Sequence, residues 1–195
     1  MNRTIFSKKR VALFFIIVLV GAFCFSFFTV NAKFPPGKEI IHPFGERISY
    51  KNMEFQVKRT EILDYDQFAE NEELIHALQG PNPEGEDVQN TKIVLITAEF
   101  YNPTDQPQKL DLTPFWLEAG NFSSQADDSL ILYYNPSGLI LNKKEKRIIK
   151  LPVPLKTVFF TGSEWETVKD RKFSLVYTLY PEKNIVKIVA ERSVA

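Results

Sequence analysis

The sequence predicts a mainly β protein, an immunoglobulin-like antiparallel β-sandwich with one short inserted helix, preceded by an N-terminal transmembrane helix. Three observations support this prediction. The segment Val11–Val30 is apolar and carries no charge. About eight short segments with strand-like patterns follow, separated by turn residues at intervals of about 8–12 residues. The segment Asp66–Gln79 has the period of a helix instead.

The apolar segment has the length of a membrane span. A hydrocarbon core of ~30 Å requires about 20 apolar residues of helix, and Val11–Val30 meets that requirement. Arg3, Lys8, Lys9 and Arg10 precede it, and short basic flanks remain in the cytoplasm. We therefore expect a cytoplasmic N-terminus and an extracellular C-terminal domain.

Two interpretations of this segment remain open. It is either a permanent single-pass anchor or a signal peptide that is cleaved after Ala32, at the tripeptide Val30-Asn31-Ala32. The length favours the anchor, because the apolar run exceeds the ~7–15 residues of a signal core. A lipidated Cys24 is not favoured, since Phe23 stands where a lipoprotein signal has a small residue.

Composition excludes several classes of function. The chain carries 24 basic and 24 acidic residues, but four basic and no acidic residues lie in the first 32 positions, so the exported part is mildly acidic. Such a domain offers no basic patch for nucleic acid. Cys24 is the one cysteine, so the exported part has no disulfide, which points to a bacterial exported protein.

Proline and glycine divide the chain into parts. Pro35, Pro36, Gly37, Pro43 and Gly45 predict a semi-extended linker after the membrane segment. The predicted organisation is a basic flank, a transmembrane or signal segment, a linker and a sandwich domain, at residues 1–10, 11–30, 31–45 and 46–195.

The strands are predicted from alternation. Met53–Lys58 and Lys172–Tyr180 alternate apolar and polar residues, as half-buried strands do. Thr91–Asn102 is apolar on both faces and is therefore expected at the centre of a sheet. Further apolar or alternating segments are Ile48–Tyr50, Lys109–Leu112, Phe115–Ala119, Leu130–Tyr134, Lys146–Val153, Val158–Thr161 and Ile185–Glu191.

The inserted helix is expected over Asp66–Gln79, with Asp66 as its cap and Gly80-Pro81 at its end. Proline, glycine and acidic residues in Pro81–Asn90 then predict an exposed loop. Gly120–Ser129 is polar and is also expected to be a loop, while Ser163 is expected to cap a short helical turn.

Four segments carry a family resemblance: "EFYNPTDQPQKL", "FWLEAG", "RIIKLPV" and "FSLVYTLYPEKNIVKIV". Over about Lys92–Val189 the chain resembles the telokin-like, immunoglobulin-type extracellular domains of uncharacterised Gram-positive membrane proteins and lipoproteins, a domain of unknown function. The turn at Asn102–Asp105 and the late strand with Phe173, Leu175 and Tyr177 match that family. The resemblance implies an exported binding or protective module without established catalysis, and it implies no site.

Candidate partner-binding residues lie in two regions. The first is the helix and loop Asp66–Asn90, and the second is Gly120–Tyr134, where two adjacent tyrosines could anchor a partner. The candidate residues are Glu70, Glu73, Glu84, Glu86, Asp87, Tyr133 and Tyr134. Trp116 is expected in the core.

The sequence offers no chemistry for catalysis or metal binding. His42 and His76 have no cysteine or second histidine nearby and are expected to be solvated. The acidic residues lack the alternation and glycine of a calcium loop, and no serine stands in a nucleophile elbow. We therefore expect no enzyme, no cofactor and no metal.

The predicted function is a membrane-tethered extracytoplasmic binding or protective module of the cell envelope. The alternative is an accessory subunit of a membrane transporter or secretion complex that assembles partly through Val11–Val30. Replacing that segment by an unrelated apolar helix would abolish assembly in the second case only.

Overall fold

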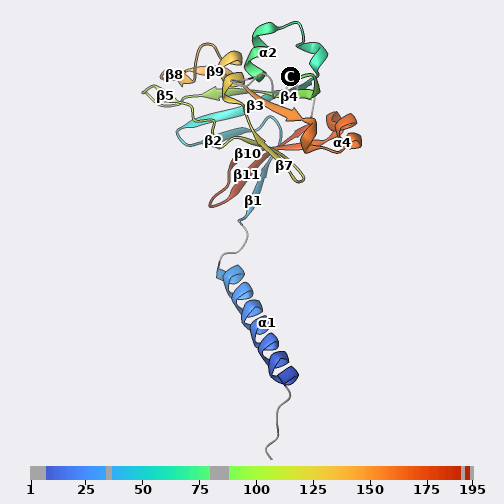
Figure 1. The fold of residues 1–195 in the computed structure, drawn as a ribbon. Coiled ribbons are helices and arrows are strands. Elements are labelled where there is room, and N and C mark those ends of the chain that lie inside the picture. The colour runs from blue at the N-terminus through green and yellow to red at the C-terminus, as the bar shows by residue number, and fades with distance from the viewer. Residues whose placement is uncertain (1–7, 34–36, 80–87, 190–191, 194–195) are drawn as a thin grey trace, which may run out of the picture. The chain divides into compact units, whose positions relative to one another are not determined.

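The computed structural model describes residues 8–33, 37–79, 88–189 and 192–193 (Figure 1). The chain divides into two compact units, Met1–Lys38 and Glu39–Ala195. In the first unit residues 8–33 are helical, and the described strands belong to the second unit.

Helix α1 (Lys8–Lys33) forms the first unit. At 1.5 Å per residue its 26 residues extend about 39 Å, more than a hydrocarbon core requires. Within Val11–Lys33, an 18-residue window has a mean hydropathy of 2.8, and none of that window is buried in the structure. The segment Val11–Lys33 is long and apolar enough to cross a membrane, a property that signal sequences share. The helix expected over Val11–Val30 is present and continues through Ala32 to Lys33.

The second unit is a sandwich of two sheets, which confirms the mainly β prediction. One sheet has the order β1-β11-β10-β6-β7, in which β1 runs parallel to β11 and the other pairs are antiparallel. Its strands are β1 (Glu39–His42), β11 (Lys183–Val189), β10 (Lys172–Thr178), β6 (Trp116–Ala119) and β7 (Phe122–Gln125).

The other sheet has the order β12-β3-β4-β9, with β2 also paired to β3, and its described pairs are antiparallel. Its strands are β12 (Arg192–Ser193), β3 (Met53–Leu63), β4 (Thr91–Tyr101), β9 (Lys146–Lys156) and β2 (Arg47–Tyr50). A separate short pair consists of β5 (Gln108–Lys109) and β8 (Ile140–Leu141). Strand β4 lies between β3 and β9 and is largely buried on both faces, as its sequence predicts.

Aromatic side chains fill the space between the sheets. Five rings form one cluster, in which the ring centroid of each residue lies within 6.4 Å of those of at least two others. Most of these pairs meet edge to face. The five rings belong to Tyr50, Phe55, Phe100, Phe115 and Tyr177. Burial raises the pKa of Tyr177 to about 12, with a further contribution from the charge of Glu46.

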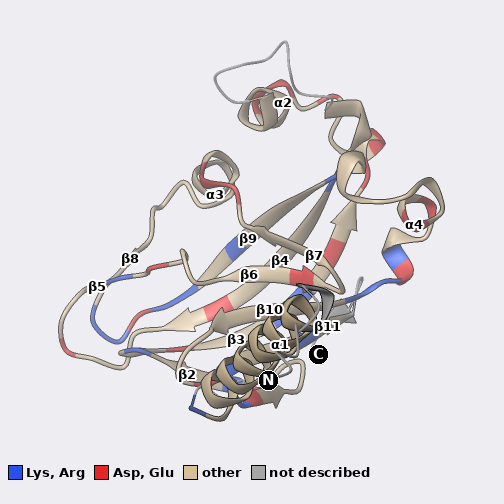
Figure 2. Cartoon of the chain, turned by 60° about the horizontal axis from the view of Figure 1, so that its bottom comes forward, with Lys and Arg blue, Asp and Glu red and all other residues tan. Residues whose placement is uncertain are grey.

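Short helices cover the outer face of the second sheet. Helix α2 (Glu72–Gln79) and helix α3 (Asp128–Tyr134) pack against each other, and their buried Leu74 and Leu130 meet Ile93 of β4 in a second apolar cluster (Figures 1 and 2). The remaining helical segments are η1 (Tyr65–Gln67), η3 (Val88–Asn90), η4 (Thr157–Phe159), α4 (Gly162–Glu166) and η5 (Val168–Asp170). The described part of the domain therefore has three short α-helices, whereas one inserted helix and one helical turn near Ser163 were expected.

Several boundaries differ from the sequence prediction. Strand β1 lies inside the expected linker, so the sandwich begins at Glu39 instead of residue 46. Helix α2 begins at Glu72 instead of Asp66, because the side-chain Oδ1 of Asn71 accepts a hydrogen bond from Leu74 N at 3.0 Å and caps it there. The expected loop Gly120–Ser129 contains β7.

Two further local predictions are wrong. Thr161, not Ser163, caps α4, since its backbone N–H donates to Glu164 Oε2 at 2.9 Å and its Oγ1 accepts from Glu164 N. Trp116 is half-buried instead of in the core, because alternation along β6 turns Leu117 inward and Trp116 outward.

Candidate binding groove

A groove of about 1020 Å³ opens between β7, α3 and the segment that joins β5 to β6. Its apolar lining comes from segments that are far apart in the sequence. These residues include Leu110, Leu112, Ala126, Ile131, Leu132 and Leu139.

The groove has an apolar floor and an apolar rim. Leu110, Leu112 and Ile131 are buried and form part of the core, whereas Leu132 is 67% exposed and Phe159 61% exposed at the edge. Large exposed apolar side chains beside a hollow are typical of sites that bind a ligand or another protein. This combination makes the groove the best candidate site in the described structure.

The wall formed by α3 is fixed by hydrogen bonds. Asp127 Oδ1 accepts from Leu130 N at 3.0 Å and caps the helix, and Asp127 N donates to Pro152 O at 3.1 Å on β9. At the other end of α3, Asn135 Nδ2 donates to Lys150 O at 2.8 Å, and Lys150 N donates to Asn135 Oδ1 at 2.9 Å. The helix is therefore tied to the outer edge of β9 at both ends.

The opposite wall is fixed in a similar way. Gln125 Nε2 donates to Thr113 O at 2.8 Å and connects β7 to the segment before β6. Asp111 pairs with Lys51 at 2.7 Å, and this hydrogen bond is the main reason that the pKa of Asp111 lies below its ordinary value. Both walls are therefore preorganised around the apolar floor.

The two candidate tyrosines connect the helices instead of standing free. Tyr133 and Tyr134 are half-buried, and their rings meet edge to face at 5.0 Å. The Tyr133 hydroxyl accepts a hydrogen bond from Asn71 Nδ2 at 2.6 Å, which links α3 to the cap of α2. Burial is the largest cause that raises the pKa of Tyr134 to about 12, and Lys150 Nζ lies 5.3 Å from its ring centroid.

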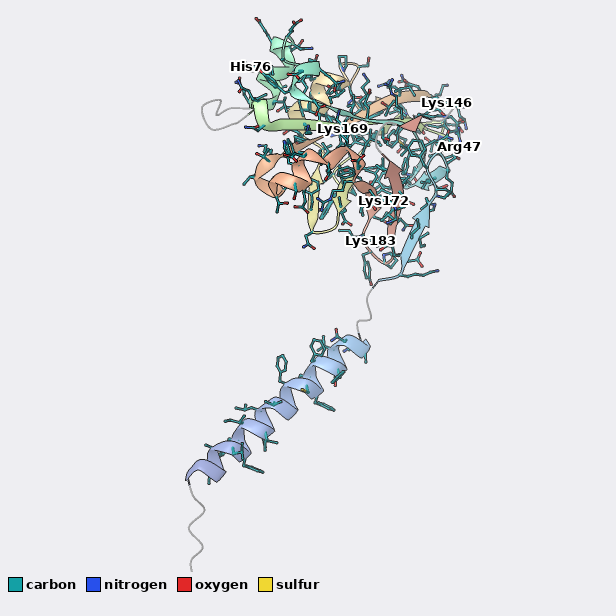
Figure 3. All side chains as sticks on the ribbon, turned by 90° about the vertical axis from the view of Figure 1, so that its right-hand side faces the viewer. Arg47, His76, Lys146, Lys169, Lys172 and Lys183 are labelled. Carbon is teal, nitrogen blue, oxygen red and sulfur yellow. The ribbon has the colours of Figure 1, made fainter. Side chains whose placement is uncertain are left out.

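Neither of the two acidic candidates that the structure describes, Glu70 and Glu73, lines the groove. Glu70 and Glu73 are exposed. Glu73 and His76 line a neighbouring shallow hollow of about 610 Å³ that shares Leu132 with the groove, and Figure 3 labels His76 on α2. Glu84, Glu86 and Asp87 lie outside the described residues. A role for these five acids in partner binding stays a prediction.

The histidines differ from each other. His76 is exposed on α2, as expected. His42 is not solvated, because β1 places it half-buried with Nδ1 3.2 Å from Glu46 Oε2 and its ring 5.9 Å from that of Tyr177. Among residues 8–33, 37–79, 88–189 and 192–193, no group of three His, Cys, Asp or Glu side chains is arranged to hold a metal ion.

Of the groove, only the segment Gly120–Tyr134 was expected to bind a partner, and its exposed apolar side chain at Leu132 was missed for an identifiable reason. Leu130–Tyr134 reads as an apolar segment without clear period, and the one local signal for a helix is Asp127 placed three residues before Leu130. The exposed position of Leu132 follows only from that helix. Phe159 lies in η4, whereas the sequence placed it in the apolar segment Val158–Thr161 among the expected strands.

Comparison with known proteins identifies a family. Residues 41–184 match a family that is described as a domain of unknown function, DUF5028. The chain belongs to this family. No curated protein matches the chain. The predicted resemblance to a domain of unknown function is confirmed.

Solved structures with distant similarity to this DUF5028 chain come from Gram-positive bacteria. Bacillus subtilis ycdA, named as a candidate lipoprotein, has 13% identity and a TM-score of 0.45 over 74% of this chain and 38% of its own. An uncharacterised β-sandwich protein of Clostridium difficile has 15% identity and a TM-score of 0.41, covering 78% of this chain and 94% of its own. A Listeria monocytogenes protein of unknown function has 8% identity and a TM-score of 0.46, covering 75% and 82%. The chain thus spans 38% of the length of the first of these proteins.

Proposed function

We propose that this DUF5028 chain is a membrane-tethered module of the bacterial cell envelope, which binds another envelope component and catalyses no reaction on it. Helix α1 is its single-pass anchor, with a cytoplasmic N-terminus and an extracellular sandwich. Cleavage after Ala32 would instead release the same module. We also infer that the sandwich is of immunoglobulin-like type, which is consistent with its two mainly antiparallel sheets around one core.

The observation that carries this proposal is the groove with its exposed apolar rim. Leu132 and Phe159 present apolar surface to solvent, while the walls behind them are held by hydrogen bonds from Asp127, Asn135 and Gln125. Rigid walls lower the conformational entropy that the sandwich itself loses when a partner binds. An apolar anchor surrounded by polar groups is the arrangement that binding hot spots share.

The polar groups of the groove support binding more than catalysis. Asp111 is paired with Lys51, and Asp127 is occupied as the cap of α3. Asp111 also accepts a hydrogen bond from Thr113 N at 3.1 Å. None of the described residues that line the groove is a histidine, the most common general base, or a cysteine, an intrinsically strong nucleophile. The proposal is therefore a non-catalytic module.

Photo-crosslinking in the native membrane tests the proposed function. A photoreactive phenylalanine analogue at Leu132 is expected to capture one discrete partner. The matched control is the same analogue at Ile148, which is 50% exposed on β9 outside the groove lining and is expected to give no such product. The variant Phe159→Asp should reduce capture from position 132 while leaving the melting temperature unchanged, since Phe159 is mostly exposed. Equal products from positions 132 and 148 would contradict the assignment of the groove.

A further inference from the structure

The loop between β10 and β11 exposes two large apolar side chains. Tyr180 is 89% exposed and Leu179 is 49% exposed, although burying either side chain would be favourable. They follow directly after β10, and Tyr177, near the end of β10, is buried in the core. The loop is therefore a rigidly supported apolar projection that the sandwich itself does not cover.

Strand pairing places this loop beside the point where the chain enters the sandwich. Strand β1 runs parallel to β11, and Glu39 at the start of β1 is opposite Lys183 at the start of β11. Figure 1 shows β1, β10 and β11 side by side at one end of the domain. Ile41, 57% exposed on β1, adds a third apolar side chain near this end.

The chain length limits how far this end can lie from the membrane. Residues 34–38 separate Lys33, the last residue of α1, from Glu39, the first of β1. Even a fully extended chain spans at most about 3.5 Å per residue, which gives roughly 20 Å between Lys33 and Glu39. The headgroup region adds about 5–8 Å on each side of the hydrocarbon core, so the loop is within reach of it.

We propose that Leu179 and Tyr180 insert into the outer interface of the bilayer that holds α1, as a second membrane contact of the sandwich. This inference rests on the part of the proposed function that keeps α1 as an anchor. Tyrosine suits this position, because its ring is apolar and its hydroxyl remains hydrated at the level of the headgroups.

The contact is expected to depend on apolar burial and not on lipid charge. Lys183 at the base of the loop is paired with Glu118 at 2.5 Å on the neighbouring β6. Glu39 and Glu182 add negative charge at the same end of the sheet. An uncharged bilayer of phosphatidylcholine is therefore the appropriate lipid surface for a test.

Fluorescence quenching in the full-length chain tests this inference. A Cys24→Ser background removes the one cysteine, and Glu182→Cys then carries an environment-sensitive dye beside the intact Leu179 and Tyr180. The matched control carries the dye at Val158, which is 79% exposed. Val158 lies in η4, which precedes β10 in the chain, whereas the loop follows the C-terminal end of β10. In phosphatidylcholine vesicles, nitroxide-labelled lipids are expected to quench the dye at position 182 several-fold more than at position 158.

Two further measurements separate the outcomes. Replacing Leu179 and Tyr180 together by serine should abolish the extra quenching at position 182 without changing the melting temperature, because both side chains are exposed. The wild-type chain labelled at Cys24 reports whether α1 lies in the bilayer. Quenching at position 24 without quenching at position 182 overturns the loop contact and leaves the anchor intact. No lipid quenching at either position overturns the anchor itself.

Discussion

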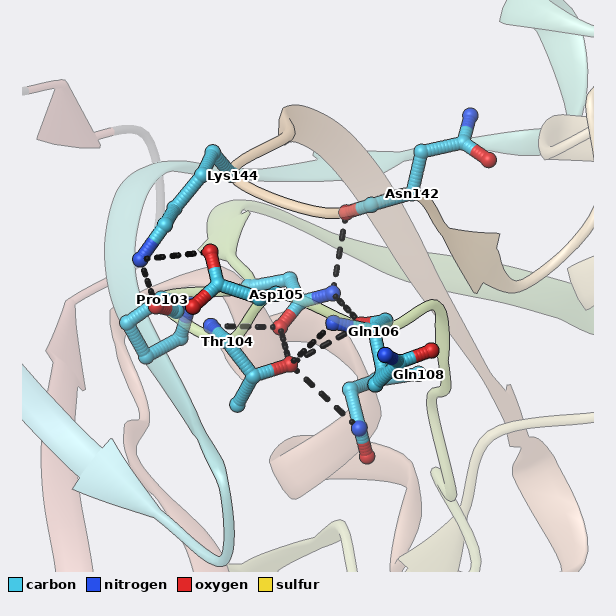
Figure 4. Close-up of polar contacts among 8 residues, drawn as sticks. Pro103, Thr104, Asp105, Gln106, Gln108, Asn142 and Lys144 are labelled. Atoms are coloured by element: carbon cyan, nitrogen blue, oxygen red, sulfur yellow. Dashed lines mark hydrogen bonds and ion pairs between the residues drawn. The ribbon is translucent and has the colours of Figure 1, made fainter.

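Asn102 is a buried polar residue that holds two turns together (Figure 4). Its Nδ2 donates to the main-chain oxygens of Gln106 at 2.8 Å and Asn142 at 2.9 Å, and its Oδ1 accepts from the N and Oγ1 of Thr104 at 3.0 and 2.7 Å. The side chain is fully buried at the end of β4. A satisfied buried amide stabilises one conformation, whereas its loss leaves several carbonyl groups without partners.

The variant Asn102→Ala is expected to lower the free energy of unfolding by about 3 kcal/mol, because buried main-chain groups lose their hydrogen bonds. Denaturant titration measures this loss. The control Asn142→Ala removes an exposed side chain and should change stability by less than about 0.5 kcal/mol. Similar effects of the two changes would show that the Asn102 side chain does not hold the turns.

Asp64 makes the stability of the domain depend on pH. Its carboxylate is hydrogen-bonded to Lys92 and to Lys169, the latter at 2.5 Å. Burial acts to raise the pKa of Asp64, but the hydrogen bonds and charges of Lys169 and Lys92 outweigh it and hold the pKa below its ordinary value. A carboxyl group with a lowered pKa stabilises the fold fully above its unfolded pKa of about 3.9, and this contribution is lost as the pH falls through the folded pKa.

The variant Asp64→Asn should therefore be less stable than wild type by about 1 kcal/mol at pH 7. The difference should shrink as the pH falls below about 4, since the wild-type carboxylate becomes protonated there. Denaturant titrations from pH 2 to 7 measure it. Asp105→Asn is the control, because Asp105 is 83% exposed and lies 3.4 Å from Lys144. A difference that stays constant down to pH 2 would contradict the assigned role.

At the scale of elements, α3 depends on the edge of β9. The backbone N–H and C=O of Lys150 point away from the sheet and are hydrogen-bonded to the Asn135 side chain. The next residue of β9 with this orientation is Pro152, which has no backbone N–H to donate. The side chain of Asn135 thus takes the place of a further strand at this edge. The same contact holds one wall of the groove.

The variant Asn135→Ala is expected to raise the rate of amide hydrogen exchange in α3 about tenfold or more, because α3 loses two hydrogen bonds to β9 that are each worth about 1 kcal/mol. Exchange measured by mass spectrometry reports this change. In β3, which lies beyond β4 in the sheet, exchange should remain as in wild type. Equal acceleration in α3 and β3 would indicate global destabilisation instead.

Sequence alone predicted the elements whose patterns are local. Strand β4 was placed at the centre of a sheet because both of its faces are apolar, and β10 followed from its alternation. Strand β1 was missed because four residues between prolines give no clear period, and its pairing with β11 joins positions more than 140 residues apart. The start of α2 was missed because Asn71, not Asp66, makes the capping bond.

The groove could be predicted only in part. The segment Gly120–Tyr134 was expected to bind a partner, and it supplies Ala126, Ile131 and Leu132 to the lining. The floor residues Leu110 and Leu112 read as strand positions, and nothing local places them opposite α3. A concave site between distant segments becomes visible only when the tertiary fold is known.

In the whole molecule, the proposed tether requires that α1 remain attached to the sandwich. With α1 retained, the sandwich stays tethered to the membrane, as the proposed function and the proposed second membrane contact both require. With α1 removed, the groove could still bind a partner, but the proposed tether and the second membrane contact would both be wrong.

The most direct test is the intact mass and N-terminal sequence of the protein extracted from its native membrane fraction. We expect a chain that still contains Val11–Val30. A chain that begins at Lys33, cut after Ala32, would contradict the tethered module and identify a released one.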